Sequence, residues 1–356
     1  MNLQTPAADA VISPRRRQVL LGAAAGLGLA GCQRYAPGAA DVARISGATM
    51  GGAYTVKLVA PGHDLVAVRS AVQGALDSVD WRMSLFRADS ELVAFNRTPT
   101  GQPFALSDEM HRVFATALAV SRETDGAFDM TVAPLVERWG FGTSPGRRVP
   151  APAAVVEARA RLGWRSLQID EATRTVTKSR SDVHADLGGI AKGHGVDRVA
   201  ATLDTLGVGH YMVEVGGEVR TRGLNGAGAP WQIGIEEPDA VPQRARHVVP
   251  LSGRAMATSG DYRNYFEQDG RRFSHEIDPA TGAPIAHALC SVTVVADDCM
   301  RADALATALI VMGPRRGVAF AEAEGIAALF IERTAPGQYR DRATAAFAAL
   351  GARAAA

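Results

Sequence analysis

The chain has 356 residues, of which 47% are hydrophobic and 21% charged, ordinary proportions for a globular protein with a real core. Its 38 basic and 37 acidic residues give a net charge of +1, which excludes the basic footprint of a nucleic-acid-binding protein, so no nucleic-acid partner is expected. A chain of this length forms one large domain or two smaller ones.

The N-terminus contains the clearest targeting signal in the sequence. Three arginines, Arg15 to Arg17, precede an apolar run over residues 19–30. Such a run is too short to span a bilayer comfortably and is typical of a signal-peptide core. Residues 29–32, LAGC, match a bacterial lipobox, in which Cys32 is lipidated and becomes the mature N-terminus. Residues 16–20 also resemble a twin-arginine export signal, and a Sec signal with surplus arginines is the alternative.

These signals predict where the mature protein resides. Residues 1–31 are expected to form the signal peptide and residues 32–44 a short tether. We expect a lipoprotein anchored to a membrane on the periplasmic side of the bacterial cell envelope. The choice between inner and outer membrane stays open.

Two further cysteines, Cys290 and Cys299, flank a β-branched stretch. If that stretch is extended, the two residues lie about 30 Å apart, against a limit of about 7 Å for a disulfide. No disulfide is therefore expected between them. No CxxC or His/Cys spacing indicates a zinc site.

Hydrophobic periodicity predicts the elements of the first half of the chain. Residues 53–60 alternate apolar and polar positions and predict a strand. Ser107 is a typical N-cap, because Asp108 and Glu109 follow it in the first turn. Helices are predicted over 64–78, 90–96, 107–124 and 152–162, an exposed loop over 142–151, and a hairpin over 167–178 that turns at 170–173.

The second half mixes strands with fewer helices. Residues 211–220 predict a strand interrupted by Gly216 and Gly217, which mark a bulge or a close backbone approach. No signal is found in the C-terminal tail. Since strands and helices are interspersed without strict alternation, the fold class is predicted to be α+β. The remaining predictions are strands over 181–187, 231–236, 247–251 and 292–295, a hairpin over 266–274, a turn at 281–282, and helices over 196–206 and over 302–312 ending at Gly313.

The glycine-rich stretch 184–197, HADLGGIAKGHGVD, is the strongest local signal. A strand that ends in glycines, with Lys192 just before a helix, suits a phosphate group, because backbone N–H groups, the helix N-terminus and the lysine all favour an anion. The spacing matches neither a Walker A loop nor GxGxxG. The alternative is an ordinary tight strand-to-helix turn.

Two further patterns carry candidate chemistry. Asp303 and Thr307 lie four residues apart on one helix face and offer hard oxygen ligands of the type that suits Mg²⁺. A buried hydrogen bond between them is the alternative. His275, close to Asp278 and Pro279, is a candidate general base, and a surface or hydrogen-bonded histidine is the alternative.

Eight short motifs, in this order, resemble the FAD:protein FMN transferases, the ApbE family, over roughly residues 45–325. Each motif alone is weak, but their order is specific. They are Met50-Gly51; Met83-Ser84-x-Phe86 with Ser90-Glu91-Leu92 and Asn96; Gly126-Ala127-Phe128-Asp129-x-Thr131; Asp186-Leu187-Gly188-Gly189-Ile190-Ala191-Lys192-Gly193; Val215-Gly216-Gly217-Glu218; Thr258-Ser259-Gly260-Asp261; His275-x-x-Asp278-Pro279-x-Thr281-Gly282; and Ala302-Asp303-Ala304-Leu305-Ala306-Thr307-Ala308.

The resemblance implies a Mg²⁺-dependent enzyme that cleaves FAD, releases AMP and attaches FMN through a phosphoester to a threonine or serine hydroxyl. The implied partner is a target flavoprotein subunit with an SGAT-like acceptor motif. The implied fold has mixed sheets with flanking helices and an FAD cleft between two interleaved subdomains. These occupy residues 45–325, with a C-terminal extension over 326–356.

The resemblance also implies roles for individual residues. Asp303 and Thr307 would ligate Mg²⁺ together with the backbone carbonyl of Gly189, and His275 would deprotonate the acceptor hydroxyl. The FAD site would be lined by Met50, Phe86, Ala127, Phe128, Asp129, Asp186, Lys192 and Ile277.

Three residues depart from the family pattern. Gly52 stands where threonine is frequent, His194 where an aromatic residue is common, and Glu276 where an aliphatic residue is usual. Glu276 adds a negative charge near a dianionic substrate and is expected to alter FAD affinity. Residues 46–49, SGAT, resemble the acceptor motif itself, but we interpret them as a lead into Met50.

Two other functions compete with FMN transfer. In an FAD pyrophosphatase, water would replace the acceptor hydroxyl and free FMN would be released with AMP. A flavin-binding lipoprotein would hold FAD without chemistry. The intact pair Asp303 and Thr307 argues against the second.

Overall fold

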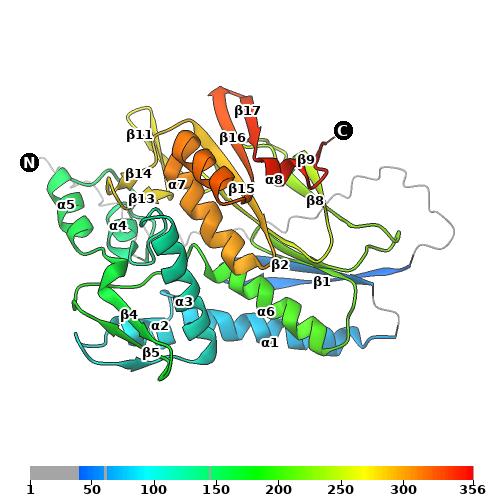
Figure 1. Ribbon diagram of the computed structural model, residues 1–356, viewed down its shortest axis with the longest axis horizontal. Coiled ribbons are helices and arrows are strands. Elements are labelled where there is room, and N and C mark those ends of the chain that lie inside the picture. The colour runs from blue at the N-terminus through cyan, green and yellow to red at the C-terminus, as the bar shows by residue number, and fades with distance from the viewer. Residues whose placement is uncertain (1–39, 60–61, 144–145, 356) are drawn as a thin grey trace, which may run out of the picture. The chain divides into compact units, whose positions relative to one another are not determined.

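A computed structural model describes residues 40–59, 62–143 and 146–355 (Figure 1). Its centre is an eight-stranded sheet in which every neighbouring pair is antiparallel. The strand order is β1-β2-β6-β7-β10-β15-β16-β17. In that order the strands are Val42–Thr49, Gly52–Val59, Tyr211–Val215, Glu218–Arg222, Ala255–Gly260, Leu289–Ala296, Ala327–Ala335 and Gln338–Ala343.

Three helices cover one face of this sheet: α1 (Leu65–Met83), α6 (Ala191–Thr205) and α7 (Cys299–Ala323). Figure 1 shows α1 and α6 lying along each other, with α7 running across the strands β10 and β15. Leu76 of α1 and Leu203 of α6 share a fully buried cluster with residues of β2 and β6. Among the described helices only α7 is long and apolar enough to cross a membrane, but its apolar residues form part of this protein's core.

A second group of elements packs against α7 from another side. It contains α2 (Glu91–Asn96), α3 (Asp108–Glu123) and a small sheet in the order β3-β5-β4. Phe95 of α2 and Phe114 of α3 meet edge to face with ring centroids 5.1 Å apart, inside the largest hydrophobic cluster. The strands of the small sheet are Phe104–Ala105, Thr175–Lys178 and Leu167–Asp170.

The remaining elements pack around this frame. A three-stranded sheet, in the order β18-β9-β8, shares a buried cluster with the central strands and with Phe347 of α8. The hairpin β11–β12 joins an aromatic cluster that contains Trp139, with Phe266 and Phe273 stacked at 5.2 Å between centroids. The bounds are α4 Ala133–Arg138, α5 Pro152–Ala160, the 3-10 helix Trp164–Ser166, β8 Trp231–Glu236, β9 Ala245–Leu251, β11 Tyr265–Gln268, β12 Arg271–Ser274, β13 Ile277–Asp278, β14 Ala283–Pro284, α8 Ala345–Ala348 and β18 Arg353–Ala354.

The predicted α+β class is confirmed, and so are the helices predicted from residues 64, 90 and 107. Asp64 accepts the Val66 N–H at 2.9 Å and begins α1, while Ser90 accepts the Val93 N–H at 3.1 Å and begins α2. Ser107 caps α3 in the same way. A short polar side chain just before an amphipathic run is therefore enough to locate these N-termini.

The predicted strand over 181–187 is wrong. Residues 183, 185 and 187 are buried in alternation, which imitates a strand, but the backbone bonds to a side chain instead of to a neighbouring strand. Asn96 donates to the Ala185 carbonyl at 2.9 Å and accepts the Ala185 N–H at 2.7 Å. The following helix, predicted from 196, already begins at Ala191, so Lys192 lies in its first turn rather than before it.

Three other predictions need correction. The interrupted strand over 211–220 is the hairpin β6–β7, whose two-residue turn is Gly216 and Gly217, both at positive φ (62° and 112°). Helix α7 does break at Gly313, with φ 77°, but helical structure resumes through Pro314 to Ala323. The C-terminal tail, in which no signal was found, supplies β16, β17, α8 and β18.

His194 of α6 predicts a pH-dependent stability. Its side chain is buried, and its Nε2 atom has no hydrogen-bond partner among the described residues. Burial lowers the pKa of His194 to about 3, and Arg198 and Arg112 add to the effect. The unfolded chain binds a proton near pH 6.5, so the contribution of His194 to stability is fully present above that pH.

As the pH falls from about 6.5 towards 3, the free energy of unfolding should decrease by about 1.4 kcal/mol per pH unit through this residue. Urea unfolding of the wild type and His194→Leu at several pH values measures this slope. The variant should match the wild type within about 1 kcal/mol at pH 7.5, because no hydrogen bond of Nε2 is lost, and should show a shallower slope. Parallel curves would contradict the assignment.

Candidate functional site

Asp303 lies where α7 packs against the start of α6. Its side chain is buried, and its Oδ2 atom accepts the Gly193 N–H at 2.9 Å. A Cβ on residue 193 would stand 2.4 Å from the Cys299 carbonyl oxygen, so only glycine lets the two helices approach this closely. The glycine of the sequence motif therefore holds the carboxylate in place. Burial raises the pKa of Asp303, against the lowering effects of Lys192 and the Gly193 N–H.

Thr307 lies one turn further along α7. Its Oγ1 atom would be 3.1 Å from a Cβ on Gly189 and is 3.3 Å from the Ser259 Oγ atom. The alternative of an Asp303–Thr307 hydrogen bond is not formed within the described residues, where Thr307 pairs with Ser259 and Asp303 with Gly193. The three residues predicted to hold a metal are thus brought to one place.

The oxygen atoms gathered here fit a hard cation. A carboxylate, a hydroxyl and a backbone carbonyl are ligands that Mg²⁺ accepts, and Mg²⁺ usually completes its shell with water and substrate phosphates. In residues 40–59, 62–143 and 146–355, no group of three or more His, Cys, Asp or Glu side chains is arranged to hold a metal. A metal at this position would therefore depend on few protein ligands and on the substrate itself.

Lys192 forms an ion pair with the buried Glu218, a contact that the sequence motifs do not predict. Its Nζ atom donates to Glu218 Oε1 at 2.5 Å, and Glu218 directly follows the Gly216–Gly217 turn. Burial raises the pKa of Glu218, although Lys192 opposes the effect. Burial alone would lower the pKa of Lys192, but the Asp303 and Glu218 carboxylates outweigh it and raise that pKa, so the lysine stays charged. With 38% of its side chain exposed, Lys192 can still reach an anionic ligand.

His275 lies between β12 and β13 and is partly exposed. Its Nε2 atom is 3.7 Å from Glu276 Oε1, and its Nδ1 atom has no hydrogen-bond partner in the described part of the chain. The Phe141 ring lies against it, with centroids 6.4 Å apart. An imidazole with an uncommitted ring nitrogen beside a carboxylate is suited to accept a proton.

Glu276, one of the three residues that depart from the family pattern, is buried rather than facing solvent. Burial raises the pKa of its carboxyl, while the nearby positive charges of His275 and Lys192 lower it. Asp303 raises it slightly further, which places Glu276 in the same electrostatic cluster. Because burial outweighs these opposing charges, the net effect favours the neutral carboxyl and reduces the expected extra negative charge next to the site.

The predicted FAD residues 127–129 lie on the loop between α3 and α4, next to Gly189. A Cβ on Gly189 would be 3.2 Å from the Phe128 ring, which is buried. The Asp129 carboxylate accepts hydrogen bonds from the N–H and the hydroxyl of Thr131, at 2.8 and 2.6 Å. Asp129 therefore shapes this loop, and Ala127 is buried beside it.

Four predicted FAD residues occupy different surroundings. Met50 sits at the β1–β2 turn with φ 45°, its Cε atom against Gly195 of α6. Asp186 accepts the Gly188 N–H at 2.8 Å, and burial raises its pKa. Ile277 is buried in the aromatic cluster. Phe86 is 77% exposed, and the structure does not bring its ring into contact with the others.

Two residues of this site belong to the sequence motifs, but the motifs alone do not predict their contacts. Glu218 ends Val215-Gly216-Gly217-Glu218, and Ser259 lies in Thr258-Ser259-Gly260-Asp261. Their partners, Lys192 and Thr307, come from distant parts of the chain. Residues 46–49 form the C-terminal end of β1 and pair with β2. This position fits their interpretation as a lead into Met50.

The chain is similar to known proteins over most of its length. A model of the ApbE family matches residues 50–330. The FAD:protein FMN transferase of Vibrio cholerae is 43% identical over 336 residues, which cover 93% of this chain and 98% of that protein. The FAD:protein FMN transferase of Haemophilus influenzae is 40% identical over 323 residues, covering 88% and 92%.

Solved structures agree. The flavinyl transferase ApbE of Pseudomonas stutzeri, in its apo form, superposes with a TM-score of 0.79 at 40% identity, covering 87% of this chain and 96% of that one. The flavin transferase ApbE of Vibrio cholerae gives a TM-score of 0.80 at 41% identity and covers 87% and 99%.

Proposed function

Because this chain belongs to the ApbE family, we propose that it is an enzyme that transfers FMN from FAD to a protein. The observation that carries the proposal is the convergence of Gly189, Asp303 and Thr307 beside Lys192, on the fold of solved flavin transferases. A site with one cation and a set of hard oxygen ligands is suited to a diphosphate substrate. FAD contains such a diphosphate.

The finer proposal is that the oxygen cluster holds Mg²⁺. Asp303, Thr307 and the Gly189 carbonyl would be the protein ligands. Bound there, Mg²⁺ would supply charge neutralisation on the FAD diphosphate and on the AMP leaving group. Lys192 would add a second positive charge next to it, held in position by Glu218.

His275 is the residue we propose for the proton transfer. The O–H bond of the acceptor threonine or serine breaks and its proton goes to the imidazole, while the oxygen forms a bond to the phosphorus of the FMN moiety. The bond between that phosphorus and the oxygen bridging to AMP breaks, and AMP leaves. Phosphoryl transfer of this kind needs positioning and charge neutralisation more than covalent help from the enzyme.

The direct experiment is incubation of the mature protein with FAD, Mg²⁺ and an isolated acceptor domain that carries an SGAT-like motif. We expect a fluorescent acceptor band, an acceptor mass raised by one FMN, and stoichiometric AMP. A threonine-to-alanine acceptor is the control and should stay dark. Formation of free FMN and AMP with a dark wild-type acceptor would instead favour a pyrophosphatase.

We further propose that Cys32 anchors the enzyme to a membrane on the periplasmic side of the cell envelope. This proposal rests on the lipobox and the signal-peptide pattern, which lie outside the described residues. The wild type should therefore be recovered with the membrane fraction, and Cys32→Ala should be recovered as soluble protein or uncleaved precursor. An unchanged distribution of mature Cys32→Ala would contradict the anchor.

A further inference from the structure

A cavity of about 860 Å³ adjoins the candidate site. It is lined by the β8–β9 loop, by parts of the hairpin β11–β12, by residues 285–287 and by the end of β16. This volume lies within the range of about 300–1,000 Å³ that is typical of ligand sites. None of the residues predicted to line the FAD site or to hold the metal lines this cavity.

Two residues of the cavity wall are nevertheless close in sequence to residues of the candidate site. Ser274 lines it and directly precedes His275 in the chain. Asp261 also lines it, two residues after Ser259, whose hydroxyl is 3.3 Å from that of Thr307. The lining therefore includes a chain neighbour of the proposed base and a residue two positions from Ser259, the partner of Thr307. A second substrate bound in this cavity could reach both.

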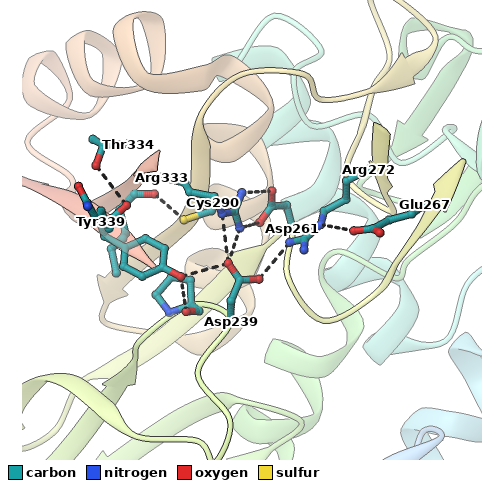
Figure 2. Close-up of polar contacts among 11 residues, drawn as sticks. Asp239, Asp261, Glu267, Arg272, Cys290, Arg333, Thr334 and Tyr339 are labelled. Carbon is teal, nitrogen blue, oxygen red and sulfur yellow. Dashed lines mark hydrogen bonds and ion pairs between the residues drawn. The ribbon is translucent and has the colours of Figure 1, made fainter. Parts of the chain in front are cut away.

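Ion pairs fix the cavity wall, as Figure 2 shows. Asp239 of the β8–β9 loop is bonded to Arg333 of β16 at 2.9 Å and to Arg272 of β12 at 3.0 Å. Arg333 also bonds Asp261 at 3.1 Å, and the Tyr339 hydroxyl reaches Asp239 at 3.1 Å. The four charged residues of this network are therefore paired with one another. They hold four separate segments in one arrangement without offering a free charge to a ligand.

The lining offers hydrogen bonds instead. Ser274 is 3% exposed, and its Oγ atom has no partner among the described residues, a costly state for a buried hydroxyl. The hairpin β11–β12 is a sheet of two strands only. The Tyr265 carbonyl of β11 already accepts a hydrogen bond from Arg147 at 2.9 Å, whereas the outer edge of β12 has no strand partner within the described residues. Unpaired strand edges bind extended polypeptide through main-chain hydrogen bonds.

We propose that this cavity receives the segment of the acceptor protein that flanks the modified hydroxyl residue. The occupant is an extended polypeptide, recognised through its backbone by the β11–β12 hairpin and Ser274, with little dependence on its charge. This inference rests on the proposed function, because it supplies the second substrate of the same reaction. It makes the acceptor path separate from the FAD site.

Two neighbouring alanines allow a matched test. Ala286 and Ala288 are both exposed, but only Ala286 lines the cavity. Ala286→Trp should raise the KM for the acceptor domain at least tenfold and leave the Kd for FAD, measured by flavin fluorescence, within twofold of the wild type. Ala288→Trp should match the wild type in both. Gln243→Trp, which obstructs the cavity from the β8–β9 loop, should reproduce the effect of Ala286→Trp.

The outcomes separate the two proposals. If the wild type does not flavinylate the acceptor, the proposed function fails before any variant is compared. If the wild type is active and both cavity variants keep its acceptor KM, the acceptor path is overturned. A parallel loss of FAD affinity would also overturn it, because the cavity would then belong to the FAD site. Thermal unfolding measurements show whether Ala286→Trp and Gln243→Trp are folded, and only a folded variant is used in the comparison.

Discussion

Replacing Asp303 with alanine is expected to lower kcat/KM for FMN transfer by about 10³-fold or more, which corresponds to about 4 kcal/mol of transition-state stabilisation. The carboxylate is buried, bonded to Gly193 and next to Lys192. The nearby Glu218 carboxylate is paired with Lys192 and does not take its place. Asp303→Asn keeps an acceptor for the Gly193 N–H and should still lose at least about 100-fold, because an amide lacks the charge.

Asp298, on the same helix, provides a control for this prediction. It caps the N-terminus of α7 by accepting the Arg301 N–H at 2.8 Å. Asp298→Ala should therefore cost about 1 kcal/mol of stability and leave transfer nearly unchanged at 25 °C. Steady-state kinetics at saturating Mg²⁺ measure the three variants. Asp303→Ala activity within tenfold of the wild type would remove this residue from the mechanism.

Replacing His275 with glutamine is expected to lower kcat by about 10²- to 10⁴-fold, the usual contribution of a general base. Glutamine is polar and of similar size, so the contact with Glu276 and the Phe141 ring is largely kept. FAD should still bind, with a Kd within about twofold of the wild type, because the proton transfer and not FAD affinity is affected. Single-turnover transfer with prebound FAD separates the two quantities.

A histidine elsewhere controls for a general effect of the substitution. His111 of α3 pairs with Glu171 at 3.1 Å, on a different part of the chain. His111→Gln should transfer FMN at the wild-type rate. If His275→Gln retained more than a tenth of the single-turnover rate, another group would have to accept the acceptor proton.

Local sequence patterns predict the helices of this fold well, because the capping residue and the amphipathic run of a helix are neighbours in the sequence. Asp64, Ser90 and Ser107 each precede an amphipathic run and each accept an N–H in the structure. The spacing of Asp303 and Thr307 predicts that they share a helix face, and the resemblance to the ApbE family implies that Gly189 joins them. In these cases a few neighbouring residues, or motif order, contain the information that the structure uses.

Contacts between distant segments are what the sequence could not predict. The alternating burial of residues 183–187 is real, but Asn96, nearly ninety positions earlier, supplies the hydrogen bonds that a strand partner would have supplied. Glu218 has no signal of its own, and its role appears only when β7 comes next to Lys192. The network of Asp239, Arg272 and Arg333 is equally invisible, because its members come from three separate elements.

The position of β16 and β17 sets the order in which this enzyme can mature. β15 is a fully buried strand for most of its length, and one of its two edges is covered only by β16, which begins at Ala327. Helix α7, with Asp303 and Thr307, lies between these strands in the chain. The frame around Asp303 and Thr307 is therefore complete only after residues 327–335 have been synthesised. Under the export proposed above, the route would decide where that occurs. A Sec-exported chain would complete its site after crossing the membrane, whereas a twin-arginine substrate would complete it in the cytoplasm, before crossing.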